Sequence, residues 1–97
     1  MVRLHIASDQ QNALPLIQSA IAATMKRIEL GLQKTEQEIQ KFEKKYNVSS
    51  EQFLNDYSAE DLAGGDDDYA SWMGELHLRQ SVLEELHLLQ NIEYAVQ

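Results

Sequence analysis

The longest regular pattern of apolar positions in the chain runs through residues 13–46. Apolar side chains recur there at steps of three and four residues, and Thr35 fills the one gap. This spacing gathers them on one side of an α-helix, close to a coiled-coil heptad rhythm. The pattern predicts one helix over 13–46, about 50 Å long at 1.5 Å per residue. The stripe that needs a partner surface consists of Leu14, Ile17, Ile21, Met25, Ile28, Leu32, Ile39, Phe42 and Tyr46.

A short helix is predicted directly after the long one. Asn47 can adopt the left-handed conformation that commonly ends helices. Ser49 and Gln52 have the spacing of a capping box, in which each side chain accepts a hydrogen bond from the other's backbone N–H. We therefore expect a helix over 50–57, with Phe53, Leu54 and Tyr57 turned inward.

The last helix is predicted over 67–90, after the glycine pair at 64–65. An acidic run opens it, where carboxylates are stabilised by free N–H groups and by the helix dipole. Its apolar residues form two lines that together cover more than half of the helix. One antiparallel neighbour buries less than that, so the pattern favours a homo-oligomer or a further protein partner. The lines are Tyr69, Trp72, Met73, Leu76, Leu83 and Leu86, and Leu78, Val82 and Leu89.

Both ends of the chain alternate apolar and polar residues, at 2–7 and 91–96. Alternation is typical of half-buried strands. These strands could pair with each other or add to the sheet edge of a partner. The predicted fold class is mainly α, a single domain built as a long antiparallel helical hairpin with a short middle helix and short terminal β-strands.

Charge is divided unevenly along the chain, whose net charge is −8. Residues 1–47 hold seven basic and five acidic groups, whereas residues 48–97 hold eleven acids and one base, Arg79. The acidic half would repel phosphates and attract a basic protein surface. A solvated acidic surface that keeps the chain soluble is the alternative interpretation. Direct binding of nucleic acid is disfavoured, since the basic residues are interleaved with glutamates.

The sequence offers little catalytic chemistry. The chain has no cysteine, which excludes thiol chemistry and fits a cytoplasmic location. It has no apolar run of about 18 residues, so we expect no membrane span, and its start lacks a signal-peptide pattern. Glu84 and His87 have the spacing of a di-iron ligand pair, but such sites use two pairs and further glutamates. We predict no enzyme activity, no metal and no cofactor.

A set of short motifs resembles the TumA-like antitoxins of TumE/TumA-type toxin–antitoxin pairs, over residues 26–78. The chain departs from their pattern where Asn47–Val48 replaces Gly-Met and where an extra Gly and Asp flank the loop. The resemblance implies a non-catalytic protein that binds and neutralises a small toxin protein. The motif residues are Phe42, Glu43, Tyr46, Ser49, Phe53, Gly65, Asp66, Asp67, Tyr69 and Trp72.

The predicted function is therefore a protein-interaction module, an antitoxin that contacts its cognate toxin and forms a homo-oligomer. If the toxin is a ribonuclease, the carboxylates would occupy its basic groove in place of RNA. The alternatives are a homo-oligomeric coiled-coil scaffold and a metal-binding helical enzyme built on Glu84 and His87. The predicted partner-binding residues are Tyr69, Trp72, Met73, Leu76 and Leu83, with Asp66, Asp67, Asp68, Glu84 and Glu85.

Overall fold

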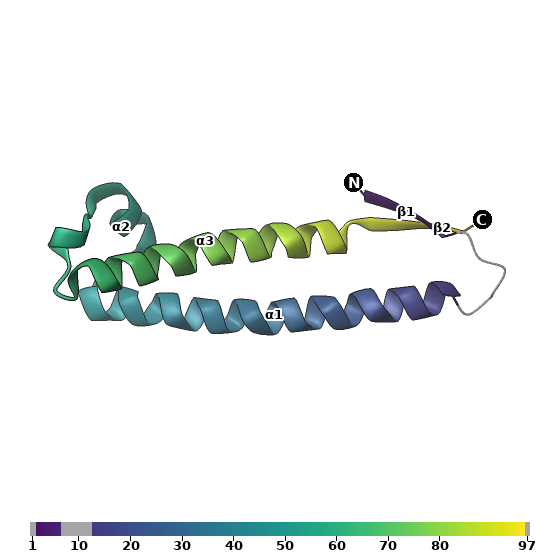
Figure 1. The fold of residues 1–97 in the computed structure, drawn as a ribbon, viewed down its shortest axis with the longest axis horizontal. Coiled ribbons are helices and arrows are strands. Elements are labelled where there is room, and N and C mark those ends of the chain that lie inside the picture. Colours follow the sequence, from purple (N-terminus) through teal and green to yellow (C-terminus); the bar gives the residue numbers. More distant parts are fainter. Residues whose placement is uncertain (1, 7–12, 97) are drawn as a thin grey trace.

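A computed structural model describes residues 2–6 and 13–96 of the chain. Two long helices, α1 and α3, lie antiparallel as a hairpin, which confirms the predicted fold class (Figure 1). At one end, which we call the closed end, α2 and the 3-10 turn η1 join the two helices. At the other, the open end, the two strands β1 and β2 lie beside the start of α1. The elements are β1 (Val2–Ile6), α1 (Ala13–Tyr46), α2 (Ser50–Asp56), η1 (Ala59–Asp61), α3 (Gly65–Gln90) and β2 (Ile92–Val96).

The observed element boundaries agree with those predicted from the sequence to within two residues. The α1 helix has the predicted ends, α2 stops one residue early, and α3 begins at Gly65 instead of position 67. The predicted first strand extended to residue 7, which lies outside the described residues. The second strand starts at Ile92 instead of position 91.

The molecule is long and thin, with extents of 61 × 20 × 17 Å. Its radius of gyration is 19.2 Å, whereas a compact chain of this length has about 12.5 Å. Its accessible surface is 6995 Å², against about 5,700 Å² for a compact monomer of 11.1 kDa. The hairpin therefore leaves roughly 1,300 Å² more surface in water than a compact fold would.

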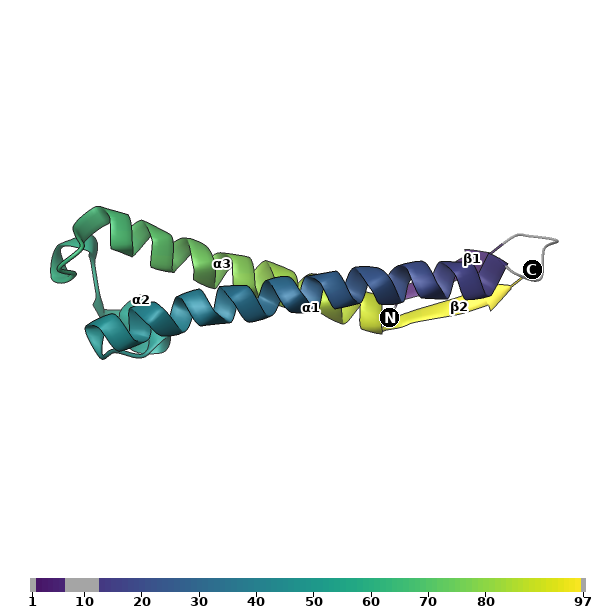
Figure 2. The ribbon, with the colours of Figure 1, turned by 90° about the horizontal axis from the view of Figure 1, so that it is seen from below.

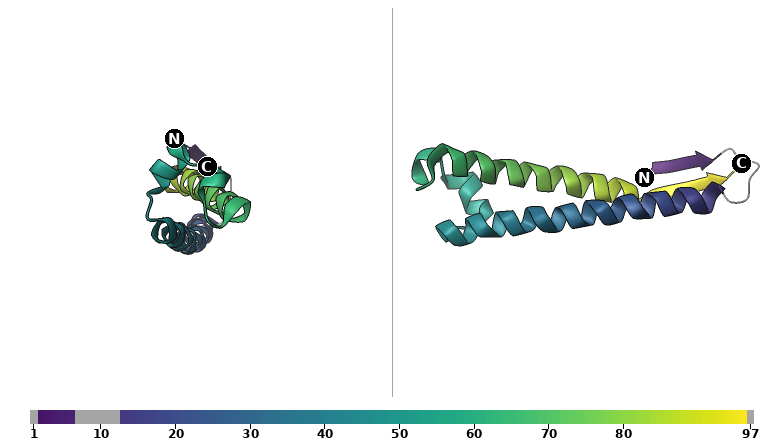
Figure 3. Two further views of the ribbon diagram at one scale, coloured as in Figure 1. Left: turned by 90° about the vertical axis from the view of Figure 1, so that its left-hand side faces the viewer. Right: turned by 60° about the horizontal axis from the view of Figure 1, so that its bottom comes forward.

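The buried core sits at the closed end, where α1 and α3 diverge and α2 contacts both (Figures 2 and 3). Five apolar residues form it, and they come from α1, α2, α3 and the residue after η1. Six further apolar residues pack against this cluster and are partly buried. The core residues are Ile39, Phe53, Leu62, Trp72 and Leu76, and the surrounding ones are Phe42, Tyr46, Val48, Tyr57, Tyr69 and Met73.

The end of α1 has the predicted chemistry. Asn47 adopts a positive φ of 53°. The N–H of Val48 donates to the carbonyl of Glu43 at 3.2 Å, the six-residue closure of a Schellman motif. Ser49 then caps α2, because its hydroxyl accepts the N–H of Gln52 at 3.1 Å. This contact confirms the serine half of the predicted capping box.

On α2, Phe53 is buried and Tyr57, directly after the helix, packs against the core as expected. The inward position predicted for Leu54 is wrong, because its side chain is 50% exposed on the outer side of this short helix.

The α1 stripe is buried only near the closed end. Thr35 and Ile39 are buried there, so the residue that fills the gap in the rhythm does lie in the stripe. Towards the open end the stripe residues are only half-buried, although α3 lies along them. The half-buried residues are Ile17, Ile21, Met25, Ile28 and Leu32.

The two strands pair with each other in parallel, from Val2 opposite Ile92 to Ile6 opposite Val96. They are parallel because β2 continues in the direction of α3, and β1 leads into the helix that runs back (Figure 3). Among the described residues the sheet has only these two strands. A two-stranded sheet is marginally stable unless other elements support it.

Candidate partner-binding surface

Trp72 lies at the centre of the aromatic cluster in the closed end and is 0% exposed. Its ring stacks on Phe53, with centroids 4.0 Å apart and 3° between the planes. Phe42 and Tyr46 stack at 5.7 and 6.0 Å. The indole N–H donates to the hydroxyl of Ser50 at 3.0 Å, which satisfies its one polar atom. These contacts use the whole Trp72 side chain within the chain itself.

The same cluster accounts for the motif residues of the antitoxin resemblance. Glu43 accepts the N–H of Ser50 at 2.9 Å and so fixes the start of α2 against α1. Tyr69 packs against Phe53 with centroids 5.2 Å apart. Phe42, Tyr46 and Trp72 complete the packing. Most of the motif residues therefore build the closed end.

Asp68 is held by α1. Lys45 donates to its carboxylate at 2.6 Å, and the hydroxyl of Tyr46 also donates to it. The hydrogen bond from Lys45, followed by that from Tyr46, lowers the pKa of Asp68 below its usual value. The hydrogen bond to Asp68 raises the pKa of Lys45. Tyr46 also accepts the N–H of Gly64 at 3.0 Å, so this network fixes the turn that leads into α3.

The five apolar residues predicted to bind a partner divide into a buried or half-buried group and one exposed residue. Trp72 and Leu76 are buried, and Tyr69 and Met73 are half-buried against the core. Leu83 is the one of the five that offers a large exposed surface. In this structure the first four stabilise the hairpin, and a role in partner binding stays a prediction for them.

The predicted carboxylates do not form one cluster. Asp66 and Asp67 are exposed in the first turn of α3, beside Asp68. Glu84 and Glu85 are exposed about 25 Å further along the helix, at 1.5 Å per residue. A partner that contacts both groups would have to span most of α3. Leu83, Glu84 and Glu85, in contrast, are neighbours on the second half of α3.

The second half of α3 exposes three leucines, of which the predicted site included Leu83 but not Leu78 or Leu88. Leu78, Leu83 and Leu88 are 45–55% exposed. Because they are five residues apart, they point to different sides of the helix instead of forming one stripe. A helix that is apolar on several sides is typical of one covered by more than one neighbour. In the sequence, Leu78 belonged to the second apolar line and Leu83 to the first, whereas Leu88 belonged to neither and was missed. We call these three residues, with Glu84 and Glu85, the α3 leucine surface.

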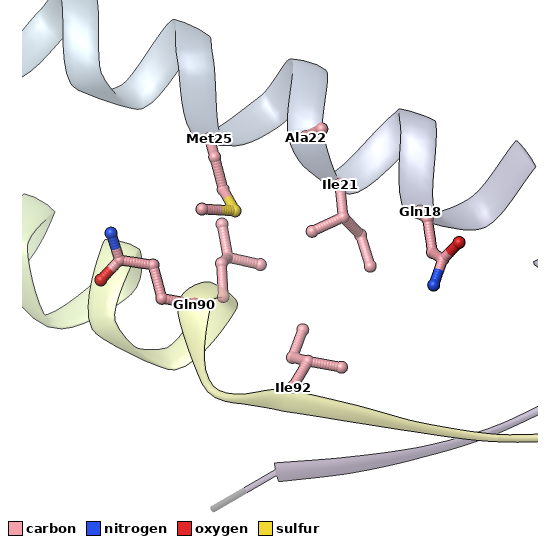
Figure 4. Close-up of a pocket in the computed structure, with 7 residues that line it drawn as sticks. Gln18, Ile21, Ala22, Met25, Gln90 and Ile92 are labelled. Atoms are coloured by element: carbon pink, nitrogen blue, oxygen red, sulfur yellow. The ribbon is translucent and has the colours of Figure 1, made fainter. Parts of the chain in front are cut away.

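A shallow cavity of about 360 Å³ lies at the open end, between α1 and the junction of α3 with β2 (Figure 4). Ile21 and Met25 point into it from α1 and face Ile92, and Gln18 and Gln90 lie at its sides. Its lining among the described residues is mostly apolar, which suits an apolar group. The lining residues are Gln18, Ile21, Ala22, Met25, Leu89, Gln90 and Ile92.

Glu84 and His87 make local contacts on α3. Gln80 donates to the carboxylate of Glu84 at 3.4 Å. The side-chain amide of Asn91 donates to the carbonyl of His87 at 2.8 Å. Within residues 2–6 and 13–96, no group of three or more His, Cys, Asp or Glu side chains is placed to hold a metal ion.

In the same part of the chain, no helix has the length and apolar character needed to cross a membrane.

The chain was compared with models of protein families, with curated proteins and with solved structures, and none of them matches it. The resemblance to TumA-like antitoxins therefore stays a prediction that rests on the motif residues.

Proposed function

We propose that this chain is a non-catalytic protein-interaction module that binds a protein through the α3 leucine surface. The observation that carries the proposal is the exposure of Leu78, Leu83 and Leu88 on a helix whose other leucines are already packed. Single exposed leucines are ordinary on protein surfaces. Three within about three turns, on several sides of one helix, are typical of a helix that packs between neighbours.

The charge of the same region indicates the chemistry of the partner. Glu84 and Glu85 are exposed beside Leu83, and residues 48–97 carry eleven acids against one base. A partner with an apolar groove rimmed by Lys and Arg fits this surface, because opposite charges speed encounter and exclude wrong partners. A small toxin that binds RNA has such a surface, so we further propose that the chain is its antitoxin, as the motif resemblance implies.

The test is co-expression of the chain with the protein encoded by the adjacent gene. Growth of the host and the mass of the purified complex are measured for the unchanged chain and for two variants. Leu78→Asp/Leu88→Asp and Glu84→Lys/Glu85→Lys should each weaken the complex by about tenfold or more, as expected for central interface residues. Both variants should also fail to suppress the partner's toxicity.

Matched controls come from the closed end. Leu54→Asp changes a leucine that is 50% exposed on α2, and Asp56→Lys/Glu60→Lys makes the same charge change on exposed residues. These variants should bind as the unchanged chain does. The proposal is wrong if the adjacent protein does not bind, or if the α3 variants bind it as tightly as the controls.

A further inference from the structure

We propose that the first half of α1 is the interface between two copies of this chain, which cross antiparallel at Ala23. This goes beyond the partner binding proposed for α3, because it uses the opposite helix of the hairpin. The starting observation is Leu16, which is 68% exposed and is the most exposed of the large apolar residues, with Leu30 at 53%.

The outer side of α1 carries its own apolar line. Leu16, Ala20, Ala23 and Leu30 follow one another at steps of four, three and seven residues, a heptad rhythm in which Arg27 takes the position between Ala23 and Leu30. All four are exposed, since α3 covers the other side of the helix, where Ile17, Ile21 and Met25 are half-buried. The first half of α1 is therefore apolar on two sides, and only one of them has a neighbour within the chain.

The charge distribution favours a second copy as the occupant. Residues 13–25 contain no charged side chain, although one residue in four of the chain is charged and the net charge is −8. Two copies with this net charge repel each other over most surfaces. The proposed contact runs from Leu16 to Leu30, so it adds Lys26, Arg27 and Glu29, a net charge of +1 on each copy. It avoids residues 48–97, which carry most of the acidic charge, and a strongly basic partner would not be attracted to it.

The pattern is also self-complementary. In a two-fold arrangement each residue before the crossing point faces the residue equally far beyond it on the other copy. With the crossing at Ala23, Leu16 faces Leu30 of the second copy at both ends of the contact, and Ala23 faces itself. The charge of Arg27 falls opposite Ser19, and the two Arg27 side chains attach about 12 Å apart along the helices. Small residues at the crossing and leucines on either side allow the helices to approach closely.

The surface area agrees with this occupant. Each chain exposes roughly 1,300 Å² more than a compact monomer of its mass. A stable interface of standard size buries about 800 Å² on each partner. The extra accessible surface of one hairpin is therefore large enough for an interface with a second copy. Two hairpins joined along α1 would form a four-helix arrangement in which α1 has apolar neighbours on both sides.

The first experiment measures mass by light scattering across a wide range of concentrations. The unchanged chain should have twice the mass of 11.1 kDa. Leu16→Asp/Leu30→Asp should reduce it to one chain while the helical circular dichroism remains, and the Leu54→Asp control should stay a dimer. A single-chain mass for the unchanged protein at all concentrations would overturn the proposal, whether or not the α3 surface binds the adjacent protein.

A second experiment tests the crossing point without weakening the interface. The chain has no cysteine, so Ala23→Cys and Gln37→Cys each introduce one thiol for a short bismaleimide cross-linker. Position 37 lies two heptads from 23 on the same side of α1, and antiparallel copies would hold the two positions about 42 Å apart. Only Ala23→Cys should give a covalent dimer. Equal cross-linking of the two variants, or none at Ala23→Cys, would contradict the arrangement.

Discussion

The closed and open ends of this hairpin are built from the same two helices but differ in how well they are covered. At the closed end α2 supplies a third element, and Trp72 and Phe53 are fully buried between helices. At the open end α1 and α3 face each other with the α1 stripe half-exposed, and Leu86 is the buried apolar residue of α3. Two helices alone cannot remove an apolar stripe from water, because each covers only one side of the other.

The polar groups show the same contrast. The closed end satisfies its polar atoms internally, as Ser50 accepts the Trp72 indole and Asp68 accepts from Lys45 and Tyr46. The first residues of α1, 13–25, carry no charged side chains that water would solvate. The sheet beside them has two strands among the described residues. The closed end thus has the features of a complete small core, and the open end those of a surface that another chain completes.

The largest difference between the ends is expected from truncation of apolar side chains. Phe53→Ala removes a fully buried ring and should lower the free energy of unfolding by about 3–5 kcal/mol. Ile21→Ala, in the half-buried part of the α1 stripe, should lower the free energy of unfolding by about 1–2 kcal/mol, because part of the Ile21 side chain is already in water. Urea unfolding at one fixed chain concentration measures both, with Trp72 as the single tryptophan probe. Equal losses would remove the distinction between the ends.

A smaller effect is expected from the buried hydrogen bond. Ser50→Ala leaves the indole N–H of Trp72 without its acceptor, which should cost about 1–3 kcal/mol. Ser81→Ala, at an exposed position of α3, should change stability by less than about 0.5 kcal/mol. If the two substitutions have the same effect in urea unfolding, the Ser50 contact does not stabilise the closed end.

Two glycines should respond in opposite directions. Gly65, the first residue of α3, has a φ of +62°, so Gly65→Ala should destabilise the chain by about 1 kcal/mol. A Cβ on Gly31 would meet nothing within 4 Å, so Gly31→Ala should stabilise α1 by up to about 1 kcal/mol. The melting temperature should move by about 4–8 °C per kcal/mol. Shifts of the same sign would contradict this assignment.

The smallest effect is the pH dependence of the Asp68 contacts. Because the folded chain lowers the pKa of Asp68, the contribution is present above the unfolded carboxyl's pKa of about 3.9. It is lost as the pH falls through the lower pKa of the folded state. Unfolding of the unchanged chain and of Asp68→Asn, compared from neutral to acidic pH, should show a stability difference that shrinks below about pH 4. A constant difference would show that Asp68 acts without its charge.

The sequence predicted what depends on local chemistry. Apolar spacing predicted α1 from end to end, including Thr35 as a buried member of the stripe. Asn47 and Ser49 predicted the end of α1 and the start of α2, since left-handed closure and N-capping need only neighbouring residues. The acidic run was correctly placed in the first turn of α3.

The sequence could not separate the buried from the exposed members of one apolar line. Trp72 and Leu83 lie on the same predicted line of α3, yet Trp72 is buried and Leu83 is 45% exposed. The difference comes from α2, whose Phe53 covers Trp72 and whose position depends on contacts distant in the sequence. The parallel pairing of β1 with β2 also follows from the path of the whole hairpin, which no local pattern encodes.

We propose that one chain completes the closed end whereas a second copy completes the open end. Amide hydrogen exchange at low and high chain concentration can distinguish the two ends, because protection follows local opening and dimers form with concentration. Amides of α1 around Ala23 should exchange more slowly as the concentration rises, while those around Trp72 exchange at the same slow rate throughout. Exchange around Ala23 that is independent of concentration and as slow as that around Trp72 would contradict the account.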